Sequence, residues 1–311
     1  MNAIVDQALN LWGMAGAKYH LAAARENQVF QVTTDNNTFA FRLHRQHYRT
    51  DVALWSELKW MEAADKGGIR VPAPIPSISG EFLQIIDGIQ VDVLTWLSGS
   101  TVGELLNRSD RSDLFFGIGR EMARLHEVSD AWNPPKGFDR CAWNRDGLLG
   151  EAPLWGRFWD SPALSLEDRQ LFRELRESAT ADLAELECNL DYGLIHADLV
   201  SANIMVDGEQ LKLIDFDDGG FGFRLFDIAT ALIKHRGEDN YPTLQAALID
   251  GYTSVRAIEL AALDLFLTLR AATYVGWNIT RMHEDGAEER SDRFISTTRQ
   301  LAQDYLAERT C

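Results

Sequence analysis

The chain gathers side chains that could do chemistry in one short segment. His196 and Asp198 are followed, after four further residues, by Asn203, and Asp215 and Asp217 come shortly afterwards. Carboxylate and amide oxygens suit Mg²⁺, which takes few protein ligands and keeps its other positions for water and phosphate. These residue types therefore favour metal-assisted phosphoryl transfer, a reaction that needs positioning and charge neutralisation more than covalent chemistry.

A hairpin is expected to bring two of these groups together. Two short apolar runs flank Asp207-Gly208, a dipeptide typical of tight turns. Folding about this turn pairs residues whose numbers sum to about 417, which puts Asn203 and Asp215 at the open end as neighbours roughly 5 Å apart. We expect both to bind Mg²⁺. Asp198 enters the same hairpin from the preceding loop and is expected to be a third oxygen group nearby.

The segment resembles the catalytic and metal-binding segments of the protein-kinase-like phosphotransferases, and most closely the branch of aminoglycoside phosphotransferases, choline kinases and type II homoserine kinases. That branch has His-Gly-Asp, four residues, Asn, and later Ile-Asp-Phe/Trp-Asp/Glu. The resemblance implies that Asp198 is the catalytic base and that Asn203 and Asp215 bind the metal. It also implies that Asp227 is a buried acid that braces the catalytic loop. Ala197 replaces the usual glycine.

Two residues of this segment have more than one interpretation. His196 is expected to be a packed, hydrogen-bonded residue that supports the catalytic loop. The alternative is that it takes part directly in the reaction. Asp217 is either a second metal or substrate group, or an acid that caps the backbone.

The resemblance also assigns residues to the nucleotide. Arg42 stands where the family has a lysine that contacts the α- and β-phosphates, and an arginine can bind phosphate as a fork. Glu57 is the expected ion-pair partner of Arg42, in preference to Glu62; a solvated surface pair is the alternative.

The phosphate-covering turn and the hinge are expected at two further places. Asn27 lies in Ala24–Gln28, the candidate for the covering turn, although the chain has no Gly-x-Gly-x-x-Gly. The hinge residues Thr95, Trp96 and Leu97 would offer backbone groups to adenine.

The pattern of apolar residues changes near residues 97–100. Before this point we predict hairpins around 35–37 and 87–88, separated by a helix at 52–66. Beyond it helical periodicity prevails, and 132–150 reads as a loop. This pattern predicts an α+β chain of two lobes, and the resemblance implies that its fold is the bilobal protein-kinase-like one. A small β-rich lobe at 1–97 would cover the nucleotide, and a large, mostly helical lobe at 98–311 would carry the catalytic loop and the metal site.

One helical face is a candidate substrate site. Arg270, Tyr274, Trp277 and Arg281 follow one another at helical spacing, so they share a face. The stripe is either a packing surface with two arginines or a wall that contacts the substrate, and both interpretations remain open.

Composition restricts the partners. The 311 residues include 30 Lys+Arg and 47 Asp+Glu, a net charge of −17 at pH 7, which repels nucleic acid and anionic membranes. The cysteines Cys141, Cys188 and Cys311 form no CxxC pair, which favours a reducing cytoplasm. We expect no membrane span and no signal peptide.

These observations and the resemblance predict an ATP- and Mg²⁺-dependent kinase. The γ-phosphoryl group would pass to a hydroxyl of a small amine-bearing molecule, homoserine-like or aminoglycoside-like. The alternatives are a Ser/Thr protein kinase of the stress-response type, a nucleotide-binding pseudokinase without turnover, and a metal-dependent hydrolase. The acceptor, the choice between ATP and GTP, and the oligomeric state stay open.

Overall fold

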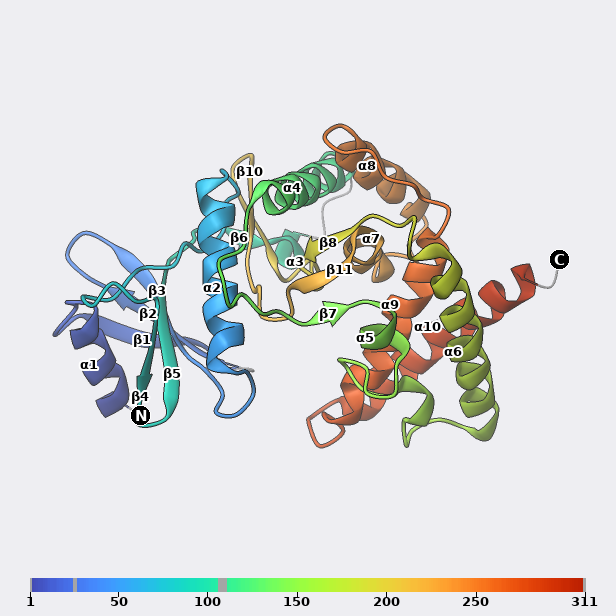
Figure 1. Ribbon diagram of the computed structural model, residues 1–311, viewed down its shortest axis with the longest axis horizontal. Coiled ribbons are helices and arrows are strands. Elements are labelled where there is room, and N and C mark those ends of the chain that lie inside the picture. Colours follow the sequence, from blue (N-terminus) through green and yellow to red (C-terminus); the bar gives the residue numbers. More distant parts are fainter. Residues whose placement is uncertain (1, 25–26, 106–110, 310–311) are drawn as a thin grey trace. The chain divides into compact units, whose positions relative to one another are not determined.

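The computed structural model describes residues 2–24, 27–105 and 111–309 (Figure 1). By their contacts, these residues form two compact units that alternate along the chain. The first unit takes the described residues of 1–107, 127–140 and 201–217, and the second those of 108–126, 141–200 and 218–311. The chain is mixed α+β, β-rich towards its N-terminus and helical towards its C-terminus, as predicted. The functional boundary at 97–98 stays a prediction.

An antiparallel sheet forms the N-terminal part of the first unit. Its strands lie in the order β1 (Lys18–Ala24), β2 (Gln28–Thr33), β3 (Thr38–Leu43), β5 (Ile89–Thr95) and β4 (Leu83–Ile86). Helix α1 (Asn2–Leu11) packs against the sheet (Figure 1), and Val5, Leu9, Phe41 and Val93 are among the core residues that join them. The sequence had not predicted α1 or β1.

The two predicted turns of this sheet are present. The Thr34 backbone N–H donates to the Asn37 carbonyl oxygen at 2.9 Å and closes the first turn. Asp87 and Gly88 in the second have φ of 51° and 77°, the left-handed values that a type I′ hairpin turn requires. Asp and Gly tolerate this conformation, so the local sequence sets the register of β4 and β5.

Helix α2 (Asp51–Lys66) is the long helix of this unit. The Thr50 hydroxyl accepts a hydrogen bond from the Ala53 N–H at 3.1 Å and caps the first turn. Glu57 is fully buried on the inner face of the helix. A buried carboxylate needs a cation or a hydrogen-bond donor beside it, so this face of α2 must pack against such a group of the sheet.

A second antiparallel sheet of the first unit carries the predicted metal residues. Its strands lie in the order β10 (Gln210–Leu213), β9 (Ile204–Asp207) and β6 (Ser100–Thr101), and α3 (Val102–Leu105) follows β6. Pairs such as Ile204 with Leu213 sum to 417, so the predicted register is confirmed. The turn falls on Gly208 and Glu209, one residue later than expected.

The second unit is mostly helical. Its elements include α5 (Arg145–Leu149), a 3₁₀ turn (Phe158–Asp160), α6 (Leu166–Leu186), α7 (Arg224–Ile233), α8 (Tyr241–Thr253), α9 (Leu263–Ile279) and α10 (Ala287–Glu308). Helix α4 (Ser112–Ala131) begins in this unit and continues into the first. Helix α10 packs along α9 and also against α6 (Figure 1).

A small sheet lies among these helices. Its order is β7 (Ala142–Trp143), β11 (Gly220–Phe223) and β8 (Tyr192–Ile195). β7 and α5 lie in the stretch that we had expected to be a loop. The loop that carries Asp198 directly follows strand β8, so one end of this loop is anchored in the sheet.

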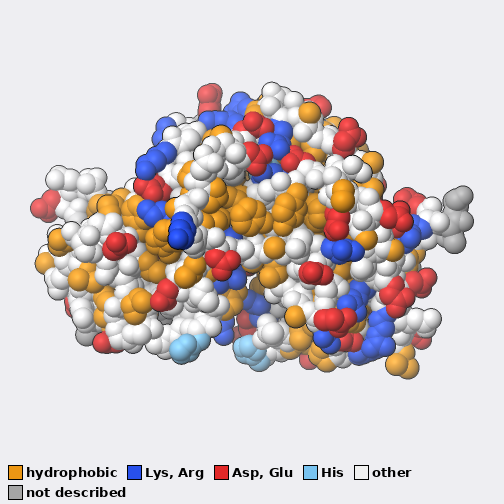
Figure 2. Space-filling model, in the orientation of Figure 1, with side chains coloured by type: hydrophobic (Ala, Val, Ile, Leu, Met, Phe, Trp, Pro, Cys, Tyr) orange, Lys and Arg blue, Asp and Glu red, His pale blue; other side chains and the backbone are white. Residues whose placement is uncertain are grey.

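Charged side chains of both signs are intermixed on the face drawn in Figure 2. Separately, an ion pair joins α10 to α6, where Arg299 Nη2 lies 2.9 Å from Asp168 Oδ2. Across the described ranges, no helix has the length and apolar character needed to span a membrane. Cys188 is an exposed free thiol, and Cys311 lies outside the described residues.

Candidate active site

A buried carboxylate holds the loop that leads to Asp198. Asp227, in the first turn of α7, is fully buried and accepts the backbone N–H groups of His196 at 2.9 Å and Ala197 at 2.6 Å. His196 is itself buried, and its Nδ1 accepts from the Asp198 N–H at 3.4 Å. Both side chains are therefore hydrogen-bonded to the backbone of this loop, and the role of His196 and Asp227 in supporting a catalytic loop stays a prediction.

His126 is a partner of Asp227 that the sequence had not identified. Its Nε2 lies 3.1 Å from Asp227 Oδ2 and its Nδ1 lies 2.9 Å from the Tyr252 hydroxyl. Burial lowers the pKa of His126 to about 4, and the charge of Arg224 acts in the same direction. Burial raises the pKa of the Asp227 carboxyl, but the hydrogen bonds from His126 and from the His196 backbone N–H outweigh it, and the net pKa is lowered.

Asp198 is contacted from helix α9. Arg270 Nη2 donates to Asp198 Oδ1 at 2.7 Å and to the Tyr274 hydroxyl at 3.2 Å. The Arg270 side chain is fully buried, whereas 24% of the Asp198 side chain is exposed. Trp277 instead stacks under Arg281, whose Cζ lies 4.1 Å from the ring centroid. The candidate substrate stripe thus reaches Asp198 through Arg270.

The two predicted metal ligands leave the open end of the β9–β10 hairpin. The Ile214 N–H donates to the Asn203 carbonyl at 2.9 Å, which extends the register by one pair, and Asp215 is the next residue. Asn203 is 8% exposed, and Asp215 is exposed with φ of 68°. An amide and a carboxylate suit Mg²⁺, so the donor chemistry fits. The described residues hold no group of three or more His, Cys, Asp or Glu arranged for a metal.

Arg42 has two acidic partners in the first unit. Its Nη1 lies 2.8 Å from Glu57 Oε1, the ion pair that we expected. Asp92, directly across the β3–β5 pair, accepts from Arg42 Nε at 2.8 Å and from Nη2 at 2.9 Å. His44 Nε2 lies 2.6 Å from the same Asp92. Glu62 pairs with lysines of its own helix instead.

This buried cluster has strongly shifted ionisation. Burial raises the pKa of Asp92, but the charges of Arg42 and His44 outweigh it and hold the pKa at about 2. Burial lowers the pKa of Arg42, and the charges of Asp92 and Glu57 outweigh it and raise the pKa overall. Both groups therefore stay charged over the whole physiological range.

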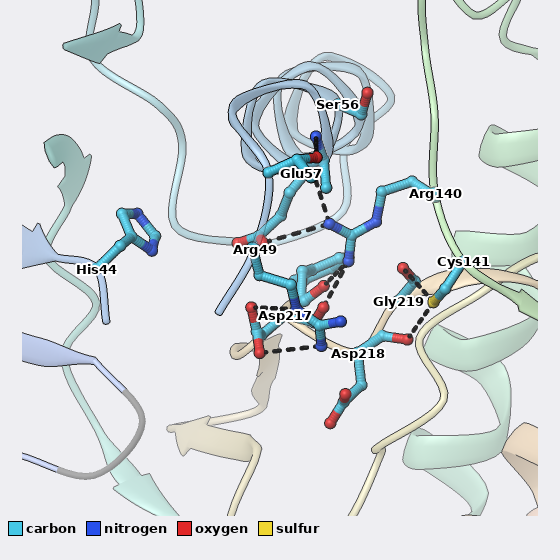
Figure 3. Close-up of polar contacts among 12 residues, drawn as sticks. His44, Arg49, Ser56, Glu57, Arg140, Cys141, Asp217, Asp218 and Gly219 are labelled. Carbon is cyan, nitrogen blue, oxygen red and sulfur yellow. Dashed lines mark hydrogen bonds and ion pairs between the residues drawn. The ribbon is translucent and has the colours of Figure 1, made fainter. Parts of the chain in front are cut away.

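Arg140 ties Glu57 to the residues that follow Asp215 (Figure 3). Its Nη2 donates to the carbonyl oxygens of Phe216 at 2.8 Å and Asp217 at 2.7 Å. Its Nη1 donates to the Ala53 carbonyl at 3.0 Å and lies 3.5 Å from Glu57 Oε2. The segment beside the predicted metal ligand is therefore fastened to helix α2.

Asp217 is paired with a partly buried arginine. Arg49 contacts the two carboxylate oxygens of Asp217 at 3.3 and 3.2 Å, as Figure 3 shows. The interpretation of Asp217 as a further metal or substrate group stays a prediction, and its observed partner is this cation.

The remaining residues predicted to contact the nucleotide lie at the ends of strands of the first sheet, Asn27 at one end and Thr95 to Leu97 at the other. Thr95 and Trp96 line a pocket of about 540 Å³ together with residues 33–39. Leu97 follows them in the chain. Asn27 Oδ1 accepts from the Arg45 N–H at 3.3 Å. Residues 25 and 26 of the predicted covering turn lie outside the described residues.

The chain is similar to one protein family and to several solved structures. Residues 20–266 match the profile of the Phosphotransferase enzyme family, APH. A homoserine kinase of Sinorhizobium fredii (strain NBRC 101917 / NGR234) is 28% identical over 273 residues, which cover 85% of this chain and 78% of that kinase.

Solved structures match over nearly the whole chain. The microcompartment-associated aminopropanol kinase has a TM-score of 0.86 and 28% identity over 99% of this chain and 98% of its own. An amicoumacin kinase in complex with AMP-PNP, Ca²⁺ and Ami has a TM-score of 0.80 and 19% identity, over 96% and 93% of the two chains, and shares the fold. The predicted fold class is therefore confirmed.

Proposed function

The chain belongs to the phosphotransferase enzyme family, and we propose that it is an ATP- and Mg²⁺-dependent kinase whose acceptor is a hydroxyl of a small amine-bearing molecule. Homoserine and aminopropanol, for which two similar kinases are named, each carry an amine and a hydroxyl. A homoserine-like amino alcohol is therefore the first candidate, and an aminoglycoside-like molecule the second. The net charge of −17 favours such acceptors over polyanions.

The observation that carries this proposal is the setting of Asp198. Its loop is bonded through two N–H groups to Asp227, and its carboxylate is bonded to Arg270 while part of it stays exposed. A fixed, accessible carboxylate can orient an acceptor hydroxyl and take its proton. In the proposed step the hydroxyl oxygen attacks the γ-phosphorus, the bond to the β–γ bridging oxygen breaks, ADP leaves, and Asp198 receives the proton.

Arg42 is proposed to contact the nucleotide phosphates. A guanidinium has five N–H donors, and the bonds to Asp92 and Glu57 use three of them. The two acidic partners therefore orient the guanidinium of Arg42, and two of its N–H donors remain for phosphate oxygens. Asn27 and the backbone of 95–97 are proposed for the phosphate turn and the adenine. In this scheme 1–97 covers the nucleotide and 98–311 carries the reaction.

Asn203 and Asp215 are proposed to hold Mg²⁺, which when bound would neutralise charge on the phosphates. The support is the register of the hairpin, which brings an amide and a carboxylate to the same open end. Arg140 keeps the following backbone in place. The cytoplasmic location expected from the cysteines belongs to the same proposal.

The test is a screen for ATP consumption with hydroxylated amines, amino acids and aminoglycosides. Product identity is read by ³¹P NMR, and Asp198→Asn is the control because it keeps the shape of the side chain and removes the base. We expect acceptor-dependent ADP formation that Asp198→Asn abolishes. The activity should also require an added divalent cation.

Other outcomes would point to the alternatives. Phosphorylation of a protein substrate with no small-molecule acceptor would favour a protein kinase. ATP binding with no turnover on any acceptor would indicate a pseudokinase. Release of phosphate from ATP at an equal rate without acceptor would indicate a hydrolase. Each of these results would overturn the proposed function.

A further inference from the structure

Arg270 is enclosed by aromatic rings. Its Cζ lies 4.4 Å from the ring centroids of Trp155 and Tyr274 and 5.3 Å from that of Phe226. All three distances fall within the range of cation–π attraction. The side chain has no exposed surface. We call Trp155, Phe226 and Tyr274 the Arg270 cage.

The rings of the cage are themselves held. Trp155 Nε1 donates to Asp218 Oδ1 at 3.3 Å. Tyr274 stacks on Phe294 of α10, with centroids 5.0 Å apart and planes 16° from parallel. Two of the three rings of the cage therefore have partners of their own, which restricts the movement of the guanidinium between them.

The hydrogen bonds of Arg270 point to Asp198. Nη2 is shared between Asp198 Oδ1 and the Tyr274 hydroxyl. Nε and Nη1 are buried and have no hydrogen-bond partner among the described residues. Native proteins satisfy nearly all buried donors, because an unsatisfied donor loses its bonds to water without replacement. An arginine serving stability alone would not be expected to leave two donors in this state.

We propose that Arg270 is a positioning residue for the base of the proposed kinase. From within its cage it fixes Oδ1 of Asp198, so that the carboxylate meets the acceptor hydroxyl in one orientation. This inference rests on the proposed function. In this role Arg270 acts through Asp198. It does not contact the substrate, which was one of the two interpretations of the helical stripe.

The charge and the shape of Arg270 both matter in this role. The bond to Asp198 is charge-assisted and short, which makes it stronger than a neutral bond. A displacement of about 1 Å at a reacting group can cost about 100-fold in rate. Loss of Arg270 should therefore lower kcat and leave binding of the acceptor nearly unchanged.

The test uses three variants of the whole protein. Arg270→Met fills the cage with an apolar side chain that packs well against aromatic rings, so the fold should survive. Arg270→Lys keeps the charge and loses the planar fork. Arg176→Met is the matched control, since it removes another guanidinium, stacked 4.1 Å from the Trp159 centroid and paired with Glu151.

Homoserine, 1-amino-2-propanol and the best acceptor of the screen serve as probes. We expect Arg270→Met to lower kcat by about 100-fold with KM for the acceptor changed less than about threefold. Arg270→Lys should recover part of the loss. Arg176→Met should keep the wild-type kcat. Melting temperature and nucleotide affinity are measured for every variant, so that a folding defect is seen separately.

Chemical rescue provides a second readout. Arg270→Ala leaves a space in the cage that a guanidinium ion can enter. Millimolar guanidinium should raise the kcat of this variant about tenfold or more, and urea, which is planar but neutral, should not. Rescue by both compounds, or by neither, would contradict a role for the charge.

The remaining outcomes separate this inference from the proposed function. An inactive wild-type protein across the whole panel would overturn both. An active wild type, an inactive Asp198→Asn and a fully active Arg270→Met would overturn only the positioning role. A raised KM with unchanged kcat would assign Arg270 to acceptor binding and would also contradict the inference.

Discussion

Asp92 binds Arg42 through both carboxylate oxygens, from the position directly opposite on the neighbouring strand. Both side chains are buried, and the pKa of Asp92 is held at about 2. The proposed phosphate-binding fork therefore has its orientation set within the protein before any nucleotide arrives. Such preorganisation reduces the side-chain ordering that binding would otherwise cost.

Substitutions at the two ends of this pair should have different effects. Arg42→Lys keeps a charge and loses the fork, and we expect nucleotide affinity to fall about tenfold, or about 1.4 kcal/mol. Asp92→Asn keeps the guanidinium but weakens its fixed orientation, so nucleotide affinity should fall less than in Arg42→Lys, while the free energy of unfolding falls by about 3 kcal/mol because a buried ion pair is broken. Titration calorimetry with a non-hydrolysable ATP analogue and urea unfolding measure the two quantities. Equal affinity of the wild type and Arg42→Lys would remove Arg42 from the nucleotide site.

The buried His126 should make stability depend on pH. Its folded pKa is about 4, below the ordinary value of 6.5, so the unfolded chain binds the extra proton first as the pH falls. The free energy of unfolding should therefore drop between about pH 6.5 and pH 4, by up to about 3 kcal/mol. Asp227 and Asp92, whose pKa values are lowered, add losses only at still lower pH.

Urea unfolding at a series of pH values measures this slope. His126→Asn should flatten it between pH 6.5 and 4, because the titrating ring is gone. His283→Asn, at an exposed histidine, is the control and should leave the slope as it is. A slope that persists in His126→Asn would place its origin elsewhere.

Sequence reasoning was reliable where the signal is local. The turns at 35–37 and 87–88 and the register of β9 with β10 follow from residues that are adjacent in the chain, and each is observed. The small β7 lies in a stretch rich in Gly, Pro and Trp, where two paired residues leave no periodicity to detect.

The missed residues are those whose partners are distant in sequence. Arg140 meets Glu57 and Phe216, and His126 meets Asp227 about a hundred residues later. Asp92 alone carried a usable signal, as the one charge in an otherwise uncharged strand, Ile89–Thr95. A buried acid in such a strand calls for a cation on its neighbour.

Arg140 should be far more important for stability than a nearby arginine bound to the same segment. Arg140→Gln leaves three carbonyl oxygens without their donor and removes a cation 3.5 Å from the buried Glu57 Oε2, so the free energy of unfolding should fall by about 3 kcal/mol or more. Arg49→Gln breaks a partly exposed pair with Asp217 and should cost about 1 kcal/mol or less. Urea unfolding compares the two, and equal losses would contradict the role given to Arg140.

Two residues of the proposed site adopt left-handed backbone conformations, Ala197 with φ of 64° and Asp215 with φ of 68°. For alanine this conformation costs about 1–2 kcal/mol, and glycine removes that strain while adding about 0.4–1 kcal/mol of unfolded-state entropy. Ala197→Gly should therefore raise the free energy of unfolding by between about 0 and 1.6 kcal/mol. Ala197→Val should lower it by more than about 2 kcal/mol, because a β-branched side chain is strained there and the site is fully buried.

Asp215→Asn separates the effect of the left-handed backbone at residue 215 from the effect of the carboxylate charge. Asparagine tolerates the left-handed region, so the melting temperature should stay near that of the wild type. Loss of the carboxylate should weaken the apparent affinity for Mg²⁺ in the kinase assay by about tenfold or more. Asp207→Asn, at the exposed far end of the same hairpin, is the matched control and should leave the Mg²⁺ dependence as it is. An unchanged Mg²⁺ dependence in Asp215→Asn, with the fold intact, would take Asp215 out of the metal site.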